Sequence, residues 1–102
     1  MKKFAFLVSL LWFISNTSYA RTGNAISQLQ MSTHPLDQGF FYGYMNGVLE
    51  SNIQKICIPN SVTDQQLALL IKKYMAEHPE ELHLWAAEII LKSVNHAWPC
   101  QK

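Results

Sequence analysis

The sequence is short of charge, and neither sign forms a run. Lysine and arginine number eight among 102 residues, aspartate and glutamate number seven, and charged residues make up 15% of the chain. Proteins that bind nucleic acid neutralise its phosphates with clustered basic side chains. No such cluster occurs, so the composition gives no electrostatic basis for a nucleic-acid partner.

The sequence also lacks an apolar run of membrane-spanning length. Its longest one, from Phe4 to Ile14, is shorter than the roughly 20 residues a spanning helix needs. Two lysines precede this run and Ser18-Tyr19-Ala20 follows it, which is the pattern of a secretory signal peptide with a small-x-Ala cleavage site. We expect residues 1–20 to be removed and residues 21–102 to work as one exported domain without a membrane contact. An uncleaved anchor is the alternative.

Cysteine is scarce as well. The only two, Cys57 and Cys100, lie in the expected exported part, where the oxidising compartment favours a disulfide. A domain of about 80 residues is marginally stable without such help. A single catalytic thiol is the alternative, but it would leave the second cysteine unexplained.

Apolar residues recur at helical spacing in three segments, and no segment shows the alternating pattern of a strand. The first segment runs from about Leu36 to Ser51 after His34-Pro35. The second follows Thr63, which opens a Thr-x-x-Gln capping box. The third begins at Pro79, where Pro and two acids suit a helix start, and its expected buried face is Leu82, Trp85, Ala86, Ile89, Ile90 and Val94. With a weaker helix signal in residues 21–33, the sequence predicts an all-α bundle of three to four main helices.

Three of the four glycines lie four residues apart within the first of these helices, at Gly39, Gly43 and Gly47. Each glycine costs a helix about 1 kcal/mol relative to alanine. We therefore expect this stripe to permit a close approach between helices, either inside the domain, which we favour, or across a homodimer.

Catalytic patterns are missing. There is no nucleophile elbow and no phosphate-binding glycine loop. His78, Glu81 and His83 lie close in sequence, but their spacing matches no established zinc pattern. We expect no enzyme activity, no cofactor and no metal, and hence a protein that works by binding.

Several short motifs, in this order, resemble the Rap/Tai family of small periplasmic immunity proteins from bacteria with type VI secretion systems. They are Gly43-Tyr44-Met45-Asn46-Gly47-Val48, Ile56-Cys57-Ile58-Pro59, Val62-Thr63-Asp64-Gln65-Gln66-Leu67, Lys73-Tyr74-Met75-Ala76-Glu77-His78-Pro79-Glu80 and Ala97-Trp98-Pro99-Cys100.

The resemblance implies an all-helical, commonly dimeric protein that binds a toxic effector. That effector would be a peptidoglycan amidase of the NlpC/P60 type, with a Cys-His pair, whose cleft the immunity protein plugs. Many relatives have a second cysteine pair, which is absent here around Leu29–Met31 and Gly39–Phe41. The resemblance therefore does not establish how well the N-terminal arm is held.

A partner-binding surface should be a shaped, polar projection that can enter a cleft. The best candidate is the turn between the last two helices, with His78, Pro79, Glu80, Glu81 and nearby His83. Two alternatives to immunity are open: a small periplasmic stress or chaperone-like binding protein with no toxin partner, and a hydrolase with an unrecognised site.

Overall fold

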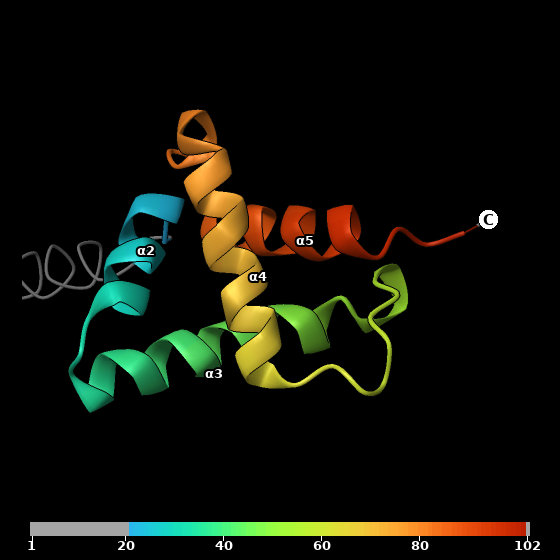
Figure 1. The fold of residues 1–102 in the computed structure, drawn as a ribbon, viewed down its shortest axis with the longest axis horizontal. Helices are drawn as coiled ribbons and strands as arrows, with labels where there is room; N and C mark the ends of the chain where they lie inside the picture. The colour runs from blue at the N-terminus through green and yellow to red at the C-terminus, as the bar shows by residue number, and fades with distance from the viewer. Residues whose placement is uncertain (1–20, 102) are drawn as a thin grey trace, which may run out of the picture.

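A computed structural model of the chain describes residues 21–101, so the expected signal peptide lies outside the described residues. The described part holds four α-helices and no strand (Figure 1). The helices are α2 (Gly23–Met31), α3 (Pro35–Ser51), α4 (Asp64–Glu77) and α5 (Ala86–Ala97), with two 3-10 turns, η1 (Ile53–Lys55) and η2 (Pro79–Glu81). The predicted all-α class is therefore confirmed.

The helices pack in two layers. In Figure 1, α3 and α5 run roughly side by side, α4 crosses in front of them, and α2 closes one side. All four helices contribute fully buried side chains to a single core, which holds Ile26, Phe41, Met45, Ile71, Ala86 and Ile90 at its centre.

The predicted helix over residues 36–51 is α3. Its N-cap is His34, whose Nδ1 accepts from the backbone N–H of Leu36 at 3.2 Å. Pro35 occupies the first helical position, where its missing N–H has no consequence. The buried residues Phe41, Met45 and Leu49 recur every four positions and face the core.

Thr63 is the N-cap of α4, as the capping-box sequence predicts. The Thr63 hydroxyl accepts from the N–H of Gln66 at 3.1 Å, which satisfies one of the free donors of the first turn. Leu67, Ile71 and Met75 recur at helical spacing and are buried, so they form the apolar stripe of this helix. The helix ends before His78-Pro79, because a residue that precedes proline disfavours the helical conformation.

The predicted start of the last helix at Pro79 is wrong. Pro79 opens a single 3-10 turn, the chain turns again, and α5 begins only at Ala86. Trp85, expected on the buried face, is 58% exposed, whereas Ala86, Ile89 and Val94 are buried as expected.

The expected role of the glycine stripe within the domain is also wrong. A Cβ placed on Gly39, Gly43 or Gly47 would meet no heavy atom within 4 Å. The three glycines are exposed, and within the described residues no other helix lies close enough to need a missing side chain here.

The N-terminal helix α2 is held by hydrogen bonds in place of the missing second cysteine pair. The side-chain amide of Gln38 lies within hydrogen-bonding distance of the carbonyls of Leu29, Gln30 and Ser32 at the end of α2. The amide of Gln30 donates to the carbonyl of Ala68 on α4 at 2.6 Å. These contacts join α2 to α3 and α4, which the sequence pattern alone does not reveal.

Cys57 and Cys100 form the predicted disulfide, with their Cα atoms 5.3 Å apart. It ties the end of the chain to the connector between η1 and α4. Among residues 21–101, no helix has the length and apolar character required to cross a membrane.

Candidate functional site

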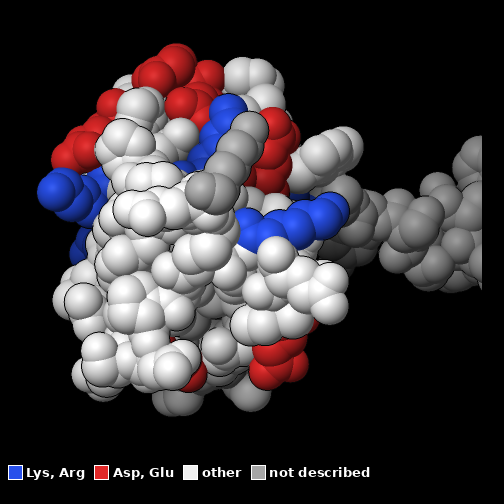
Figure 2. Space-filling model, turned by 90° about the vertical axis from the view of Figure 1, so that its right-hand side faces the viewer, with Lys and Arg blue, Asp and Glu red and all other residues white. Residues whose placement is uncertain are grey.

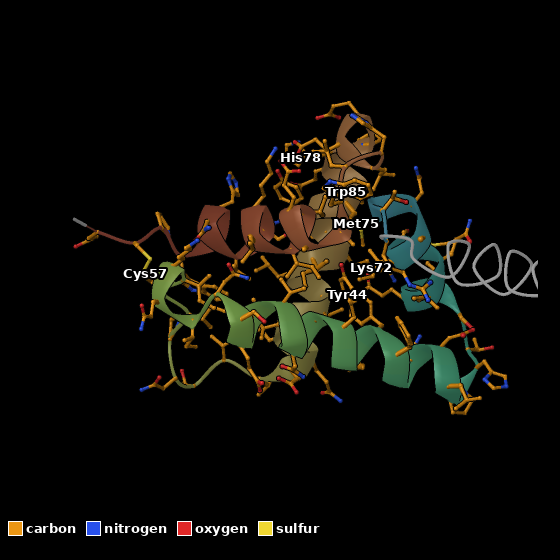
Figure 3. All side chains as sticks on the ribbon, turned by 180° about the vertical axis from the view of Figure 1, so that it is seen from behind. Tyr44, Cys57, Lys72, Met75, His78 and Trp85 are labelled. Carbon is orange, nitrogen blue, oxygen red and sulfur yellow. A yellow bond between two sulfur atoms is a disulfide. The ribbon has the colours of Figure 1, made fainter. Side chains whose placement is uncertain are left out.

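The turn between α4 and α5 stands at one end of the molecule and carries much of its negative charge. Figure 2 shows acidic side chains gathered at the upper end, with a basic side chain among them. Glu77, Glu80 and Glu81 follow one another closely here, because α4 ends and η2 begins within four residues. Figure 3 labels His78 and Trp85 at this side of the molecule and Cys57 at the other.

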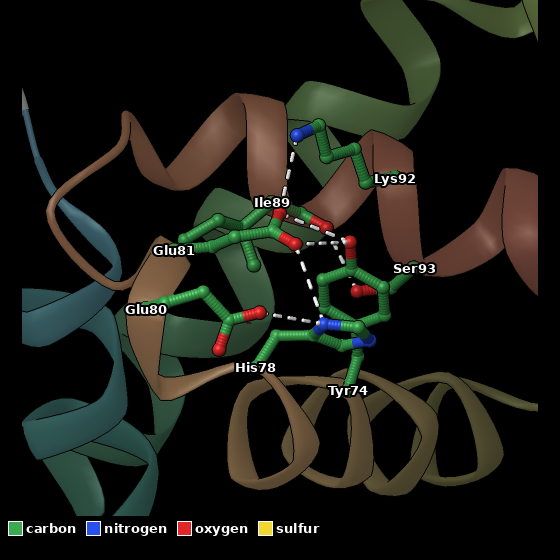
Figure 4. Close-up of polar contacts among 7 residues, drawn as sticks. All are labelled: Tyr74, His78, Glu80, Glu81, Ile89, Lys92 and Ser93. Carbon is green, nitrogen blue, oxygen red and sulfur yellow. Dashed lines mark hydrogen bonds and ion pairs between the residues drawn. The ribbon is translucent and has the colours of Figure 1, made fainter.

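Glu81 is the centre of the turn's polar contacts (Figure 4). The hydroxyl of Tyr74, on α4, lies 3.0 and 3.2 Å from its two carboxylate oxygens. The ammonium of Lys92, on α5, lies 3.1 Å from Oε1. One carboxylate on η2 thus joins the two helices that flank the turn.

His78 completes this network. Its Nδ1 lies 3.1 Å from Oε1 of Glu80 and 3.4 Å from Oε2 of Glu81. Its ring stacks on that of Tyr74 with centroids 4.3 Å apart. The imidazole therefore has a fixed orientation between the helix it ends and the two carboxylates that follow it.

The hydrogen bonds and ion pairs of the turn shift the pKa values of its ionisable side chains. Lys92 bonded to Glu81 holds the pKa of that carboxyl below its ordinary 4.5. The pKa of Glu80 is lowered by a hydrogen bond from backbone N–H within the turn, followed by the contact with His78. Burial, and then the bond to Glu81, raises the pKa of Tyr74, and the bond to Glu81 raises that of Lys92. At neutral pH both carboxylates are therefore charged and Tyr74 is a hydrogen-bond donor.

A metal ion is the other arrangement that could use these side chains. Within the described residues, His78, Glu80 and Glu81 each offer one ligand atom, and these atoms lie within 4.8 Å of one another. Lys92 already places a positive charge 3.1 Å from Glu81, where it would repel a cation. The ion pairs account for the cluster without a metal.

The structure brings together four of the five predicted partner-binding residues and separates the fifth. His78, Pro79, Glu80 and Glu81 form the turn, whereas His83 lies exposed in the loop beyond it. Glu81 and His78 are engaged inside the turn, which leaves Glu80 and His83 more open to a partner.

Sequence reasoning missed Tyr74 and Lys92 as parts of this site. Lys92 lies on α5 and reaches back eleven residues to Glu81. No local pattern signals such a contact, because it depends on how α4 and α5 pack.

A hollow adjoins the turn between α2 and α4. Its volume is about 280 Å³, and its lining is mostly apolar, with Met31, Met75, Pro79 and Leu82 among the contributors. The turn therefore joins a charged end to an apolar flank, and this end of the molecule offers both kinds of contact to a protein partner.

Comparison with known proteins gives a family match. No curated protein and no solved structure matches the chain. The model of the family described as Rap1a immunity proteins matches residues 17–100, which is most of the sequence and includes both cysteines and the whole turn. A family of immunity proteins is a family of binding proteins rather than enzymes. The chain belongs to the Rap1a immunity protein family.

Proposed function

We propose that this protein is a periplasmic immunity protein that binds and inhibits a peptidoglycan amidase effector delivered by type VI secretion. The observation that carries the proposal is the family match over residues 17–100. The disulfide between Cys57 and Cys100 supports an oxidising compartment such as the periplasm. In this proposal, residues 1–20 direct export and are then removed.

The turn His78–Glu81, with His83 beside it, is the proposed inhibitory element. Its shape is fixed before binding, because Glu81 is held from both sides by Tyr74 and Lys92. Preorganisation lowers the entropy lost on association. A rigid projection of this kind fits into a cleft and blocks it without any chemistry of its own.

The experiment is a protection assay in the periplasm. An NlpC/P60-type amidase from the type VI secretion system of the same bacterium is exported in cells that also produce this protein. We expect the cells to survive with it and to lyse without it, and the purified pair to form a stable complex. Equal lysis in both cultures would contradict the proposal.

Variants of the turn locate the inhibitory surface in the same assay. Glu80→Gln and His83→Ala change exposed side chains that do not hold Glu81 in place. We expect both to weaken protection and complex formation. Glu50→Gln on α3 removes the same charge as Glu80→Gln from an exposed position outside the turn, and it should protect like the wild type.

A further inference from the structure

Trp85 occupies a position at which the fold gives no reason for a tryptophan. It is the N-cap of α5, where Ser, Thr, Asp or Asn normally supplies a side-chain hydrogen bond. Trp85 supplies none, and 58% of its surface is exposed. Neither capping nor packing in the core therefore explains this side chain.

The backbone that carries Trp85 is nevertheless firmly held. The N–H of Gly23 donates to the carbonyl of Leu84 and the N–H of Asn24 to that of Leu82, both at 2.9 Å. The N–H of Ala86 donates to the carbonyl of Arg21 at 2.8 Å. We call this set of contacts between residues 21–24 and 82–86 the N-terminal clasp.

The clasp also pairs Thr22 with Trp85 in an isolated antiparallel bridge. The hydroxyl of Thr22 accepts from the N–H of Ala25 at 3.3 Å and so caps α2. The same residue thus starts α2 and pairs with the residue before α5. The exposed indole is therefore presented by a rigid backbone rather than by a loose loop.

Gly23 makes the clasp possible. A Cβ at this position would lie 2.3 Å from Cδ1 of Ile89 and 3.0 Å from the carbonyl oxygen of Leu82. Ile89 can rotate away, but the backbone of Leu82 has to shift. Gly23 is thus the one glycine of the described chain whose missing side chain lets two segments meet.

We propose that Trp85 is the anchor by which this protein docks on its effector, and that Gly23 is a positioning residue that sets the anchor through the N-terminal clasp. The inference rests on the proposed immunity function, and it adds a contact residue to the surface formed by the turn His78–Glu81. Exposed tryptophans on rigid supports are frequent hot spots of protein interfaces. The complementary site on the effector is an apolar hollow with an acceptor for the indole N–H.

The acidic turn before Trp85 is a second feature that the partner has to match. The turn Pro79–Glu81 carries two carboxylates four to five residues before Trp85 in the sequence, and Glu88 follows in the first turn of α5. A partner that contacts both Trp85 and this turn must place basic side chains opposite the carboxylates. We therefore expect the association rate with the effector to fall as the salt concentration rises.

The first test measures binding of the type VI amidase to Trp85→Ala by calorimetry or surface plasmon resonance. We expect affinity to fall roughly 30-fold or more, as for a hot-spot residue. Leu69→Ala is the matched control, since Leu69 is an apolar residue of α4 that is 66% exposed, and it should bind like the wild type. Wild-type affinity in Trp85→Ala overturns the proposal. So does a loss of self-association in Trp85→Ala with unchanged affinity for the amidase, because Trp85 would then contact a second copy.

The second test needs no effector. In the mature protein, residues 21–102, Trp98→Phe leaves Trp85 as the sole tryptophan, so fluorescence anisotropy reports its mobility. Adding Gly23→Ala should lower the anisotropy and weaken binding, while circular dichroism stays helical. Gly43→Ala adds the same methyl group where no atom lies within 4 Å, and it should change neither. Unchanged anisotropy and affinity in Gly23→Ala would overturn the positioning role. If no amidase binds the wild type, the proposed function fails, whereas lowered anisotropy still supports the clasp.

Discussion

The hydroxyl of Tyr74 and the carboxylate of Glu81 meet at 3.0 and 3.2 Å, across the point where α4 ends. Lys92 reaches the same carboxylate from α5. The side chain of Glu81, on η2, therefore fixes how α4 and α5 are oriented relative to the turn between them. The shape of the proposed inhibitory turn depends on this contact more than on any apolar packing in the turn itself, whose residues Pro79–Glu81 include none that is buried.

Replacing Tyr74 with phenylalanine tests that dependence. Tyr74→Phe keeps the ring that stacks on His78 and removes only the hydroxyl. We expect the free energy of unfolding to fall by about 1 kcal/mol, the usual net value of one hydrogen bond. Urea denaturation measures it. Tyr44→Phe is the control, since no hydrogen bond of the Tyr44 hydroxyl is found among residues 21–101, and an equal loss in both variants would contradict the prediction.

The pH dependence of stability follows from the shifted groups of the turn. The folded-state pKa values of Glu80 and Glu81 lie below the ordinary 4.5. Their contribution is therefore complete above pH 4.5 and is lost as the pH falls through the lowered values. We expect the urea midpoint to drop on the acid side of pH 4.5.

At alkaline pH, stability is expected to fall as the pH rises. The pKa values of Tyr74 and Lys92 are raised above 10.0 and 10.5 in the folded state. Their contribution is complete below pH 10 and is lost as the pH rises through the raised values. Glu81→Gln should flatten both limbs of the profile, because Glu81 contacts both groups. Glu50→Gln should leave both limbs of the stability profile unchanged. The same flattening in both variants would contradict the assignment of these limbs to the contacts of Glu81.

The elements that local sequence specifies were predictable. Thr63 caps α4 and the stripe from Leu67 to Met75 faces the core, because capping and helical spacing are properties of adjacent residues. The disulfide was predictable for a different reason, since two cysteines in an exported domain have only each other.

The remaining features depend on contacts between distant segments. Trp85 fits the apolar spacing of α5, yet its backbone pairs with Thr22, sixty-three residues earlier, and this pairing keeps the side chain outside the core. Gly23 looks unremarkable in sequence and matters only because Leu82 and Ile89 lie against it. In contrast, a Cβ added to any of the three glycines of the conspicuous stripe would meet no atom within 4 Å among the described residues.

The disulfide should contribute a large share of the stability. Its cysteines are 43 residues apart in sequence, and closing a loop of that size stabilises a protein by about 4 kcal/mol in the chain-entropy model. Small domains have net stabilities of about 5–15 kcal/mol. We therefore expect Cys57→Ala with Cys100→Ala to melt roughly 15–30 °C below the oxidised wild type. Thermal unfolding followed by circular dichroism measures this, with the reduced wild type as a second comparison, and a melting temperature within a few degrees of the oxidised wild type would contradict it.

Alanine at the glycine stripe should stabilise the monomer. Gly39, Gly43 and Gly47 lie inside α3 with open space where a Cβ would stand, and alanine is favoured over glycine in a helix by about 1 kcal/mol. Each single substitution should therefore raise the urea midpoint, in contrast to Gly23→Ala, which should lower it. Light scattering on the same variants tests the homodimer that the family resemblance implies. If a second copy packs closely on this stripe, the added methyl groups will collide with it. The measured mass will then fall from that of a dimer to that of a monomer, although each substitution stabilises the folded monomer.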